Sequence, residues 1–283
     1  MSGLPPLAAD LPAGFVEALA HRAARLGGFA SRVVWYDSVS STNDVAERAA
    51  AAGAAHGTVV AAECQESGRG RMGRTWFSPP GAGLYVSVVL RPGEMVGDWD
   101  ARSVSVASRI TLTAGVALAE GLRASTGLPV EIKWPNDLVV GPRKVCGILA
   151  EAAAAGGELR HVILGYGINV LSAAYPPDIA HRATSIEAEV GRAVDRAAVW
   201  AESLACLAER LTELSVGGFD QVLDRWRALS PSSVGARVEI VDPSGWHAAT
   251  TSGVDRNGAL LVTADRTTRR VIAGEVRWLT GRG

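Results

Sequence analysis

Apolar and polar positions divide the chain into two regions of different periodicity. Up to about residue 230, short apolar runs that predict strands alternate with longer stretches whose apolar residues recur at helical spacing. The predicted strands are residues 33–36, 58–63, 84–90 and 161–170. The predicted helices are residues 14–26, a segment that follows a polar turn at 37–44 and ends near 52, residues 103–124, and residues 195–229 with an interruption near Gly217 and Gly218.

Two further features complete the predicted fold. Residues 130–140 and 143–150 predict a β-hairpin that turns at Gly141 and Pro142, and Pro135 should confine its part of the first strand to an edge or an end. The C-terminal region then changes to five short β runs, with an Asn-Gly pair as a strong hairpin signal, at residues 237–241, 247–254, 259–263, 269–272 and 276–279. The fold class is therefore α+β: a mixed sheet with flanking helices, then a small β-barrel that begins near residue 232.

The composition is that of an ordinary globular protein. Of 283 residues, 48% are hydrophobic and 20% are charged. No apolar run reaches the roughly 18 residues of a membrane span, and the N-terminus lacks the basic start and apolar core of a signal peptide. We therefore expect a cytoplasmic protein without membrane contact. Cys64, Cys146 and Cys206 are widely spaced and have no histidine partner at ligand spacing, which argues against structural zinc and a disulfide framework.

The stretch at residues 68–76, here called the cradle, holds three glycines and three arginines directly after a predicted strand. Glycines let successive backbone N–H groups point at one ligand, and Arg69, Arg71 and Arg74 add guanidinium groups suited to phosphate or carboxylate. The glycines also satisfy the G-x-G-x-x-G dinucleotide pattern, but two consecutive prolines follow and forbid the helix which that pattern requires. The cradle therefore predicts anion binding by another architecture.

Two other interpretations of the cradle stay open. An exposed, basic, glycine-rich loop can simply be solvated, although so many like charges would cost stability without a ligand. Alternatively, arginines on phosphates, with Trp76 and Phe77 stacked on bases, would bind single-stranded nucleic acid. The formal net charge of −1 argues against nucleic acid, because such proteins normally carry a basic surface.

Lysine is almost absent from the chain, which makes its positions informative. Arginine supplies nearly all the positive charge, and the only two lysines, Lys133 and Lys144, both lie on the predicted hairpin. An ammonium group is a compact point charge that a planar guanidinium cannot imitate. We therefore predict functional roles for both lysines.

Consecutive polar residues and strand glycines mark two further candidate positions. Ser41, Thr42 and Asn43 precede a predicted helix. One of the hydroxyls could be a simple N-cap, but the three side chains together also offer donors and acceptors for a neutral polar group such as a urea or amide. Gly165 and Gly167 lie inside a predicted strand, which indicates close approach of a ligand or of another backbone.

Several ordered motifs together resemble those of biotin protein ligase. They are the cradle, Ser-Thr-Asn upstream of it, and Lys-Trp-Pro-Asn-Asp, Arg-Lys-Val-Cys-Gly-Ile-Leu and Gly-Tyr-Gly-Ile-Asn downstream. The resemblance runs from about residue 33 to the end and includes Gly274-Glu275. It implies a catalytic domain of the biotin/lipoate ligase type at residues 33–231, an SH3-like barrel at residues 232–283 and an N-terminal extension of unassigned role at residues 1–32.

The resemblance implies an enzyme that uses biotin and ATP with Mg²⁺. Such ligases form biotinyl-5′-adenylate, release pyrophosphate and transfer biotin to one lysine of the biotin carboxyl carrier domain of acetyl-CoA-carboxylase-type enzymes. The residues carried over for biotin are Ser41, Thr42, Asn43, Gln65, Arg69, Gly70, Arg71, Lys144 and Gly147. Those carried over for ATP and the adenylate are Arg69, Arg71, Arg74, Trp76, Asn136, Lys144 and Asn169. No separate side-chain cluster for a metal is expected, because Mg²⁺ would enter with ATP.

The implied chemistry needs positive charge where two anions meet. Arg69, Arg71, Lys144 and Mg²⁺ would supply it as the biotin carboxylate attacks the α-phosphate. Lys133 and Asp137 are expected on the side of the acceptor lysine and the metal. Asp137 is our hypothesis for the general base of transfer, which an Asp137→Asn variant with full transfer activity would contradict. We also predict that the cradle is mobile without ligand, since ordering about ten residues costs on the order of 10 kcal/mol of backbone entropy.

The nearest alternative to biotin ligation is a lipoate or octanoate protein ligase or transferase, which shares the broad fold. Those proteins lack the arginine-rich glycine loop followed by tryptophan, and their acyl ligands have no ureido ring. A winged DNA-binding domain needs on the order of 60 residues. Only about 32 residues precede the first predicted strand, so we expect a ligase without operator binding. We expect a monomer or a weak homodimer that binds no nucleic acid.

Overall fold

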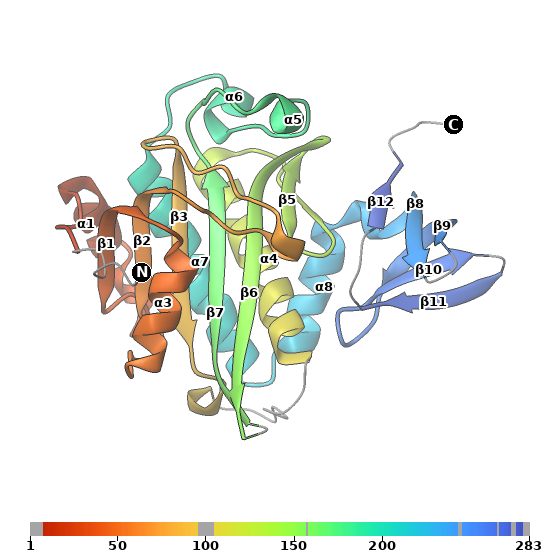
Figure 1. Ribbon diagram of the computed structural model, residues 1–283, viewed down its shortest axis with the longest axis horizontal. Coiled ribbons are helices and arrows are strands. Elements are labelled where there is room, and N and C mark those ends of the chain that lie inside the picture. Colours follow the sequence, from red (N-terminus) through yellow and green to blue (C-terminus); the bar gives the residue numbers. More distant parts are fainter. Residues whose placement is uncertain are drawn as a thin grey trace.

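The computed structural model describes residues 8–95, 105–156, 158–242, 245–264, 266–272 and 276–279. Within these ranges no helix is both long enough and apolar enough to cross a membrane. Two sheets are present: a large mixed sheet in the body of the molecule and a smaller antiparallel sheet at the C-terminal end (Figure 1). The predicted α+β fold class is confirmed.

The large sheet has seven strands in the order β1-β2-β3-β7-β6-β5-β4. Their bounds are Val33–Val39 (β1), Val59–Gln65 (β2), Gly83–Leu90 (β3), Glu131–Lys133 (β4), Asp137–Val140 (β5), Arg143–Ala155 (β6) and Glu158–Asn169 (β7). β1 and β2 pair in parallel because helix α3 (Thr42–Ala51) crosses between them, and the other neighbouring strands pair antiparallel. This order places β7, which comes late in the chain, at the centre of the sheet.

Three long helices cover one face of the large sheet: α4 (Ser105–Thr126), α7 (Arg196–Ser215) and α8 (Phe219–Leu229) (Figure 1). α4 and α7 pack so closely that a Cβ added at Gly121 would lie 2.7 Å from the Ser203 Cα. The predicted apolar face of α7 is buried, at Leu204, Leu207, Leu211 and Leu214. Burial of each such side chain contributes about 1.5–3 kcal/mol, so this face adds substantially to stability.

The N-terminal segment packs on the same side of the molecule. The predicted helix at residues 14–26 is two short helices, α1 (Ala13–Ala20) and α2 (Ala23–Leu26). The Phe15 ring lies 5.2 Å from the Trp35 ring and 5.3 Å from the Trp200 ring. Arg22 and Arg25 both bind Glu202 on α7 at 2.7 Å, and these tertiary contacts favour the broken helix over the continuous one.

The C-terminal sheet has five antiparallel strands in the order β11-β10-β9-β8-β12. Their bounds are Val234–Asp242 (β8), Gly245–Val254 (β9), Leu260–Ala264 (β10), Thr267–Val271 (β11) and Val276–Trp278 (β12). The predicted turn between β9 and β10 is confirmed, with Gly258 at a φ of 82°. The carbonyl of Gly258 accepts a hydrogen bond from Trp134 Nε1 at 3.0 Å, which joins this sheet to β4. Gly274 and Glu275 lie outside the described residues.

The structure departs from several predictions of individual elements. Residues 130–140 are not one strand, because Pro135 has no N–H to donate and the chain folds back there, so that β4 and β5 pair with each other. β1 continues to Val39, so Asp37 and Ser38 belong to a strand rather than a turn. The helices α5 (Pro177–Ala180) and α6 (Ile186–Val190) were not predicted. Residues 103–104 of the predicted helix 103–124 lie outside the described residues.

Candidate active site

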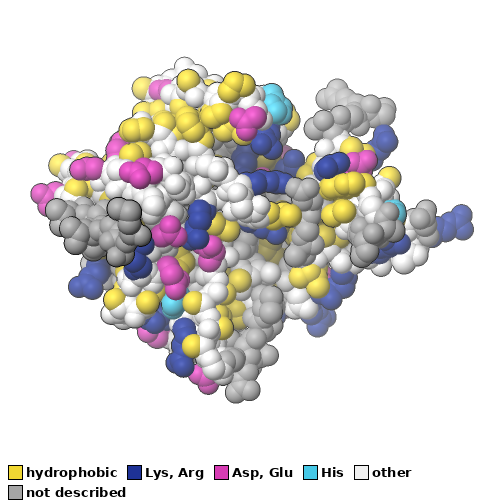
Figure 2. All heavy atoms as spheres, viewed as in Figure 1, with side chains coloured by type: hydrophobic (Ala, Val, Ile, Leu, Met, Phe, Trp, Pro, Cys, Tyr) yellow, Lys and Arg dark blue, Asp and Glu magenta, His cyan; other side chains and the backbone are white. Residues whose placement is uncertain are grey.

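A cavity of about 800 Å³ lies on the sheet face opposite the long helices. α3 and the cradle lie on this face, and the cavity extends to Trp278 at the edge of the C-terminal sheet (Figure 1). Figure 2 shows Lys and Arg side chains gathered around the hollow beside the C-terminal sheet. The residues predicted from the sequence all border this one cavity: Ser41, Thr42, Asn43, Gln65, Arg69, Gly70, Arg71, Arg74, Trp76, Lys133, Asn136, Asp137, Lys144, Gly147 and Asn169.

One end of the cavity is polar but uncharged. Thr42 and Asn43 are buried, at 3% and 4% exposure, and Gln65 Oε1 accepts hydrogen bonds from the Thr42 backbone N at 2.9 Å and from Thr42 Oγ1 at 3.1 Å. Ser41 is the N-cap residue of α3, yet its side chain makes no capping hydrogen bond. The N-cap alternative therefore does not account for the Ser41 side chain, and Ser41, Thr42, Asn43 and Gln65 all border the cavity.

Ser87 belongs to the same polar end and was missed from the sequence. Its Oγ lies 2.8 Å from Thr42 Oγ1 and 2.5 Å from Asn43 Oδ1, and the residue is fully buried. The available signal was a single serine in β3, whose other residues are glycine, tyrosine and aliphatic residues. A buried polar group must find partners inside the protein, so such a position points to a polar network.

The cradle forms a narrow hairpin rather than the start of a helix. The Gly70 N–H donates to the Arg74 carbonyl at 2.7 Å, and the Trp76 N–H donates to the Gly68 carbonyl at 2.8 Å. At its tip Met72 has a φ of 57° and its side chain is 64% exposed. This geometry agrees with the rejection of a dinucleotide fingerprint, which needs a helix N-terminus at the glycines.

The other end of the cavity is cationic. Lys144 Nζ lies 2.5 Å from Asp137 Oδ1 and 5.1 Å from the centre of the Trp76 ring. Arg71 Nη1 donates to Asn136 Oδ1 at 3.4 Å. Burial lowers the pKa of the Arg71 guanidinium, and the nearby Asp137 carboxylate opposes this shift. An anion bound here would compensate the partly buried positive charges of the cradle and Lys144.

Lys133 lies where the two sheets meet. Its Nζ is 5.5 Å from the centre of the Trp278 ring. Burial lowers the pKa of Lys133, Asp137 acts in the opposite direction, and Lys144 lowers it further. Trp278 was missed from the sequence because nothing in a local pattern indicates that β12 borders the cavity.

The strand glycines form the floor under Trp76. A Cβ at Gly167 would lie 2.3 Å from Trp76 Nε1, and one at Gly147 would lie 2.8 Å from Trp76 Cζ3. A Cβ at Gly165 would lie 2.1 Å from Asn43 Oδ1. The predicted close approach is therefore real, but the atoms that approach these glycines in the structure are the side chains of Trp76 and Asn43.

Asn169 and Tyr175 occupy the rim of the cavity near Trp76. The Asn169 amide donates to the Thr184 carbonyl at 2.9 Å, so it holds the segment that runs beside Lys144. Tyr175 packs edge-on to Phe77 at 6.2 Å, and its buried hydroxyl has no hydrogen-bond partner among the described residues. No local pattern in the sequence indicates Tyr175, which adds an aromatic surface to the rim.

Neither metal-binding clusters nor reactive cysteines stand out in the described ranges. No group of three or more His, Cys, Asp or Glu side chains there is arranged to hold a metal ion. The three cysteines are free, and burial raises the pKa of the Cys146 thiol well above its usual range. The chemistry of the cavity therefore rests on its arginines, lysines, amides and single carboxylates.

Comparisons with known proteins match the part of the chain that holds most of these residues. A profile of the Biotin/lipoate A/B protein ligase family matches residues 35–169. The chain is 31% identical to the bifunctional ligase/repressor BirA of Bacillus spizizenii, over 86% of this chain and 73% of that protein. It is also 31% identical to the biotin–[acetyl-CoA-carboxylase] ligase of Mycobacterium tuberculosis, over 83% of this chain and 85% of that protein.

Among solved structures, a biotin protein ligase from Aquifex aeolicus in complex with biotin and ATP resembles this fold. The TM-score is 0.73 at 27% sequence identity, and the match covers 88% of this chain and all (100%) of that one. The similarity therefore extends over both sheets rather than over one motif.

Proposed function

This chain belongs to the biotin/lipoate A/B protein ligase family, and from that membership we propose that it joins biotin to ATP and then to a protein lysine. The observation that carries the proposal is the division of the cavity into an uncharged polar end and a cationic end. Biotin has the same division, with a neutral ureido ring at one end and a carboxylate at the other. Lipoate has a carboxylate but no polar ring group, so it would leave Thr42, Asn43 and Gln65 without a ligand partner.

In the first step the biotin carboxylate oxygen attacks the α-phosphorus of ATP, and pyrophosphate leaves. The two reactants are anions, so positive groups must be in place where they meet. Lys144, Arg71 and Arg74 border the cationic end of the cavity, and Arg69 and Gly70 belong to the same cradle. Thr42, Asn43, Ser41 and Gln65 would hold the ureido ring, with Gly147 under the chain between the two ends.

ATP would lie at the end of the cavity nearer the C-terminal sheet. Trp76 offers a ring face for the adenine, and Asn136 and Asn169 border the same region. Asp137 is the carboxylate that would hold Mg²⁺ together with the phosphates, since Mg²⁺ is commonly bound by one or two carboxylates plus substrate phosphates. When bound, Mg²⁺ supplies positive charge to the phosphate oxygens.

In the second step an acceptor lysine amine attacks the carbonyl carbon of the mixed anhydride, the bond to AMP breaks, and the amine loses a proton. Asp137 is our candidate to receive that proton, and Lys133 lies beside it at the junction of the two sheets. The chemistry of the acceptor, a lysine on a biotin carboxyl carrier domain, is supported by the names of the relatives. Positioning the amine near an activated acyl group is itself a strong source of acceleration.

We further propose residues 33–231 as the catalytic domain, residues 232–283 as a small second domain, and no operator binding. In support of the last point, the described part of residues 1–32 packs on the body through Phe15 and through the ion pairs of Arg22 and Arg25. That surface of the N-terminal segment is therefore committed to contacts within the chain.

Exchange of labelled pyrophosphate into ATP tests the proposal. We expect biotin, and not lipoate or octanoate, to drive exchange, and we expect a purified carrier domain to be biotinylated in the presence of ATP. Exchange driven by lipoate would preserve the reaction type but overturn the substrate. Absence of exchange with every acid, together with salt-sensitive binding of oligonucleotides, would replace the proposal by the nucleic-acid alternative.

A further inference from the structure

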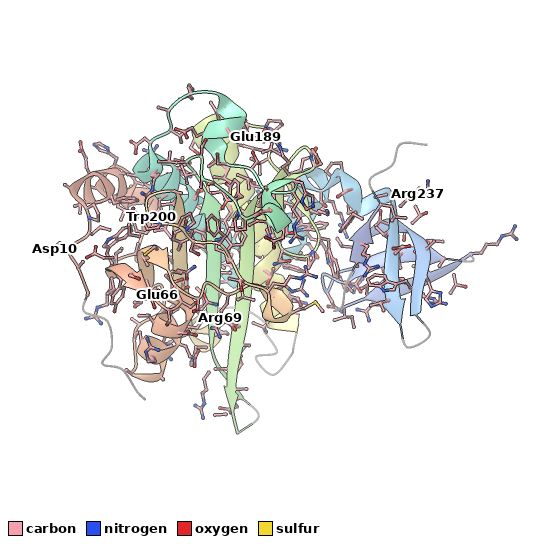
Figure 3. All side chains as sticks on the ribbon, turned by 45° about the horizontal axis from the view of Figure 1, so that its top comes forward. Asp10, Glu66, Arg69, Glu189, Trp200 and Arg237 are labelled. Atoms are coloured by element: carbon pink, nitrogen blue, oxygen red, sulfur yellow. The ribbon has the colours of Figure 1, made fainter. Side chains whose placement is uncertain are left out.

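Glu151 lies outside the residues so far given a role, yet it contacts two of them. It lies on β6, and its Oε2 accepts hydrogen bonds from Asn43 Nδ2 at 2.6 Å and from Arg69 Nη2 at 2.8 Å. The same Arg69 nitrogen lies 2.9 Å from Asp44 Oδ1 on α3. Arg69 on the cradle is thus held between two carboxylates that belong to two different elements. Figure 3 labels Arg69, which lies over the central strands of the sheet.

These contacts continue as a series of hydrogen bonds that runs through the polar end of the cavity. From Glu151 the series runs through Asn43, Ser87 and Thr42 to Gln65. Gln65 Nε2 then donates to Ser78 Oγ at 2.8 Å, and Ser78 Oγ donates to the Trp76 carbonyl at 3.1 Å. Arg69 begins the cradle and Trp76 ends it, so one hydrogen-bonded chain connects the two ends of the cradle through the floor of the proposed biotin site.

Between its ends the cradle contacts the turn after β4 through Arg71, whose Nη1 lies 3.4 Å from Asn136 Oδ1. On another side a second hollow, of about 490 Å³, is bordered by cradle residues together with Glu66, Ser67, Leu149 and Glu151. Contacts at the ends of the cradle therefore contribute to its position. At one end the Arg69 side chain joins the cradle to both β6 and α3 by opposite charges, through Glu151 and Asp44.

We propose that Glu151, together with Asp44, is a positioning residue that holds the cradle over the biotin site by binding Arg69, and that the Arg69 side chain anchors the cradle rather than binding the substrate anion. The inference rests on the proposed function for the identity of the ligand. Two carboxylates already compensate the Arg69 charge and would repel a third anion, whereas Arg71 and Lys144 border the cationic end. Glu151 also orients the Asn43 amide, so one carboxylate couples cradle position to the ring site.

Loss of the Glu151 charge should weaken biotin binding rather than slow the chemical step. Loss of the Glu151 charge favours the open cradle, and the ligand must then close it at the expense of affinity. The three side chains are partly exposed, Arg69 at 42%, Glu151 at 37% and Asp44 at 36%, so water screens the ion pairs. We therefore expect a change of about threefold to tenfold in biotin affinity, with kcat at saturating substrate nearly unchanged.

Limited trypsin digestion of the ligand-free protein tests the anchor without any ligand. Glu151→Gln and Asp44→Asn should each raise the rate of cleavage after Arg71 and Arg74 by about threefold to tenfold. Glu158→Gln is the matched control, because Glu158 is an exposed carboxylate at the other end of the same hairpin. Biotin titrations by calorimetry on the same proteins should show the matching loss of affinity for Glu151→Gln and Asp44→Asn only.

A double-mutant cycle separates anchoring from a general structural effect. In an Arg69→Gln background, Glu151→Gln should add less than about twofold to the cleavage rate, because its partner in the cradle is already gone. Equal effects with and without Arg69, or Glu151→Gln and Asp44→Asn proteins cleaved at the wild-type rate, would overturn the proposal. If the wild-type protein fails to bind biotin while the cleavage results hold, the proposed function falls and the anchor stands.

Discussion

The two faces of the large sheet are built from different interactions. The covered face packs against α4, α7 and α8 through apolar side chains, with ion pairs such as Arg22–Glu202 and Arg210–Glu120 among the elements around it. The open face carries α3, which packs on it through a smaller apolar cluster that includes Val45, Val60 and Ile163, and beside α3 the cavity is lined by hydrogen bonds among amides, hydroxyls and carboxylates. Tyr166 and Gly167 lie next to each other on β7, yet Tyr166 contacts Trp200 on the covered side and Gly167 lies under Trp76 on the open side.

This difference separates stability from activity. Apolar packing is non-directional and sums over many contacts, so it sets the free energy of unfolding. Hydrogen bonds and charges in the open cavity are directional, and each contributes little net stability because water competes for it. Substitutions on the covered face should therefore change stability at nearly constant specific activity, and substitutions of polar residues that line the open cavity should do the reverse.

The largest stability effect is expected for Trp200→Ala on the covered face. The Trp200 ring is completely buried against Phe15 and Trp35, and truncation leaves a cavity that costs about 3–5 kcal/mol of unfolding free energy. Urea unfolding measures the loss, with Val216→Ala at an exposed position of 71% as the control. A loss below about 1 kcal/mol would contradict the assignment of stability to this face.

Lys144→Ala should produce the converse result on the open face. We expect biotin-dependent pyrophosphate exchange to fall by about 10²–10³-fold, since a positioned charge is lost where negative charge develops. The pair with Asp137 is about one-third exposed, at 32% and 30%, so the unfolding free energy should change by less than about 1 kcal/mol. Exchange above one tenth of wild type would remove Lys144 from the chemistry. Lys144→Arg should recover only part of the activity, because the planar fork replaces a point charge.

Gly167→Ala tests the open face at a single backbone position, where Trp76 lies against the sheet. The added methyl would lie 2.3 Å from Trp76 Nε1 and must displace the indole. We expect the KM for ATP to rise about tenfold and the KM for biotin to change less, because the displaced indole borders the proposed nucleotide end of the cavity. Gly28→Ala, where a Cβ would meet nothing within 4 Å, is the control. An unchanged KM for ATP would separate Trp76 from the nucleotide.

The smallest expected effect concerns the charged margin of the covered face. Burial would raise the pKa of Glu202, but hydrogen bonds from Arg25 and Arg22 outweigh it, and the net pKa is lowered below the ordinary 4.5. A hydrogen bond from Arg25 chiefly lowers the pKa of Glu209 as well. Because the folded pKa is the lower one, this stability is present above about pH 4.5 and is lost as the pH falls through the folded pKa.

Removal of the Arg25 guanidinium should make the free energy of unfolding depend less on pH. We expect Arg25→Ala to cost about 1 kcal/mol at pH 7, given that its side chain is 36% exposed, and to differ less from wild type as the pH falls below 4.5. Unfolding by urea at several pH values measures both quantities. A difference that stays constant down to pH 3 would show that packing, rather than charge, accounts for the loss.

Much of the fold could be predicted from the local spacing of apolar residues, because that spacing indicates which face of a helix or strand is buried. The strands of the covered face and the helices α7 and α8 were predicted within a few residues, since their apolar spacing matches their buried faces. The break between β4 and β5 and the short helices α5 and α6 were not predicted. Their conformations depend on tertiary contacts and on which strands pair, which periodicity does not encode.

The residues of the candidate site also fall into two groups, those that a local motif indicates and those that only the folded structure brings to the cavity. Residues within strong motifs, such as Arg71 and Lys144, were identified from the sequence and do border one cavity. Glu151 and Trp278 were missed because Glu151 meets the site only through the sheet order and Trp278 only through the approach of the second sheet. Contacts that depend on pairing between distant strands carry no local signal.

The five residues from Lys133 to Asp137 also set a length scale for the reaction. At one end Lys133 and Trp134 contact the C-terminal sheet, and at the other Asp137 holds the Lys144 ammonium. Because the chain folds back between them, Lys133 and Asp137 are register partners, and their Cα atoms lie about 5 Å apart. While these contacts hold, the C-terminal sheet stays within one strand spacing of the Lys144 ion pair, so a movement of that sheet would be felt directly at the cationic end of the cavity.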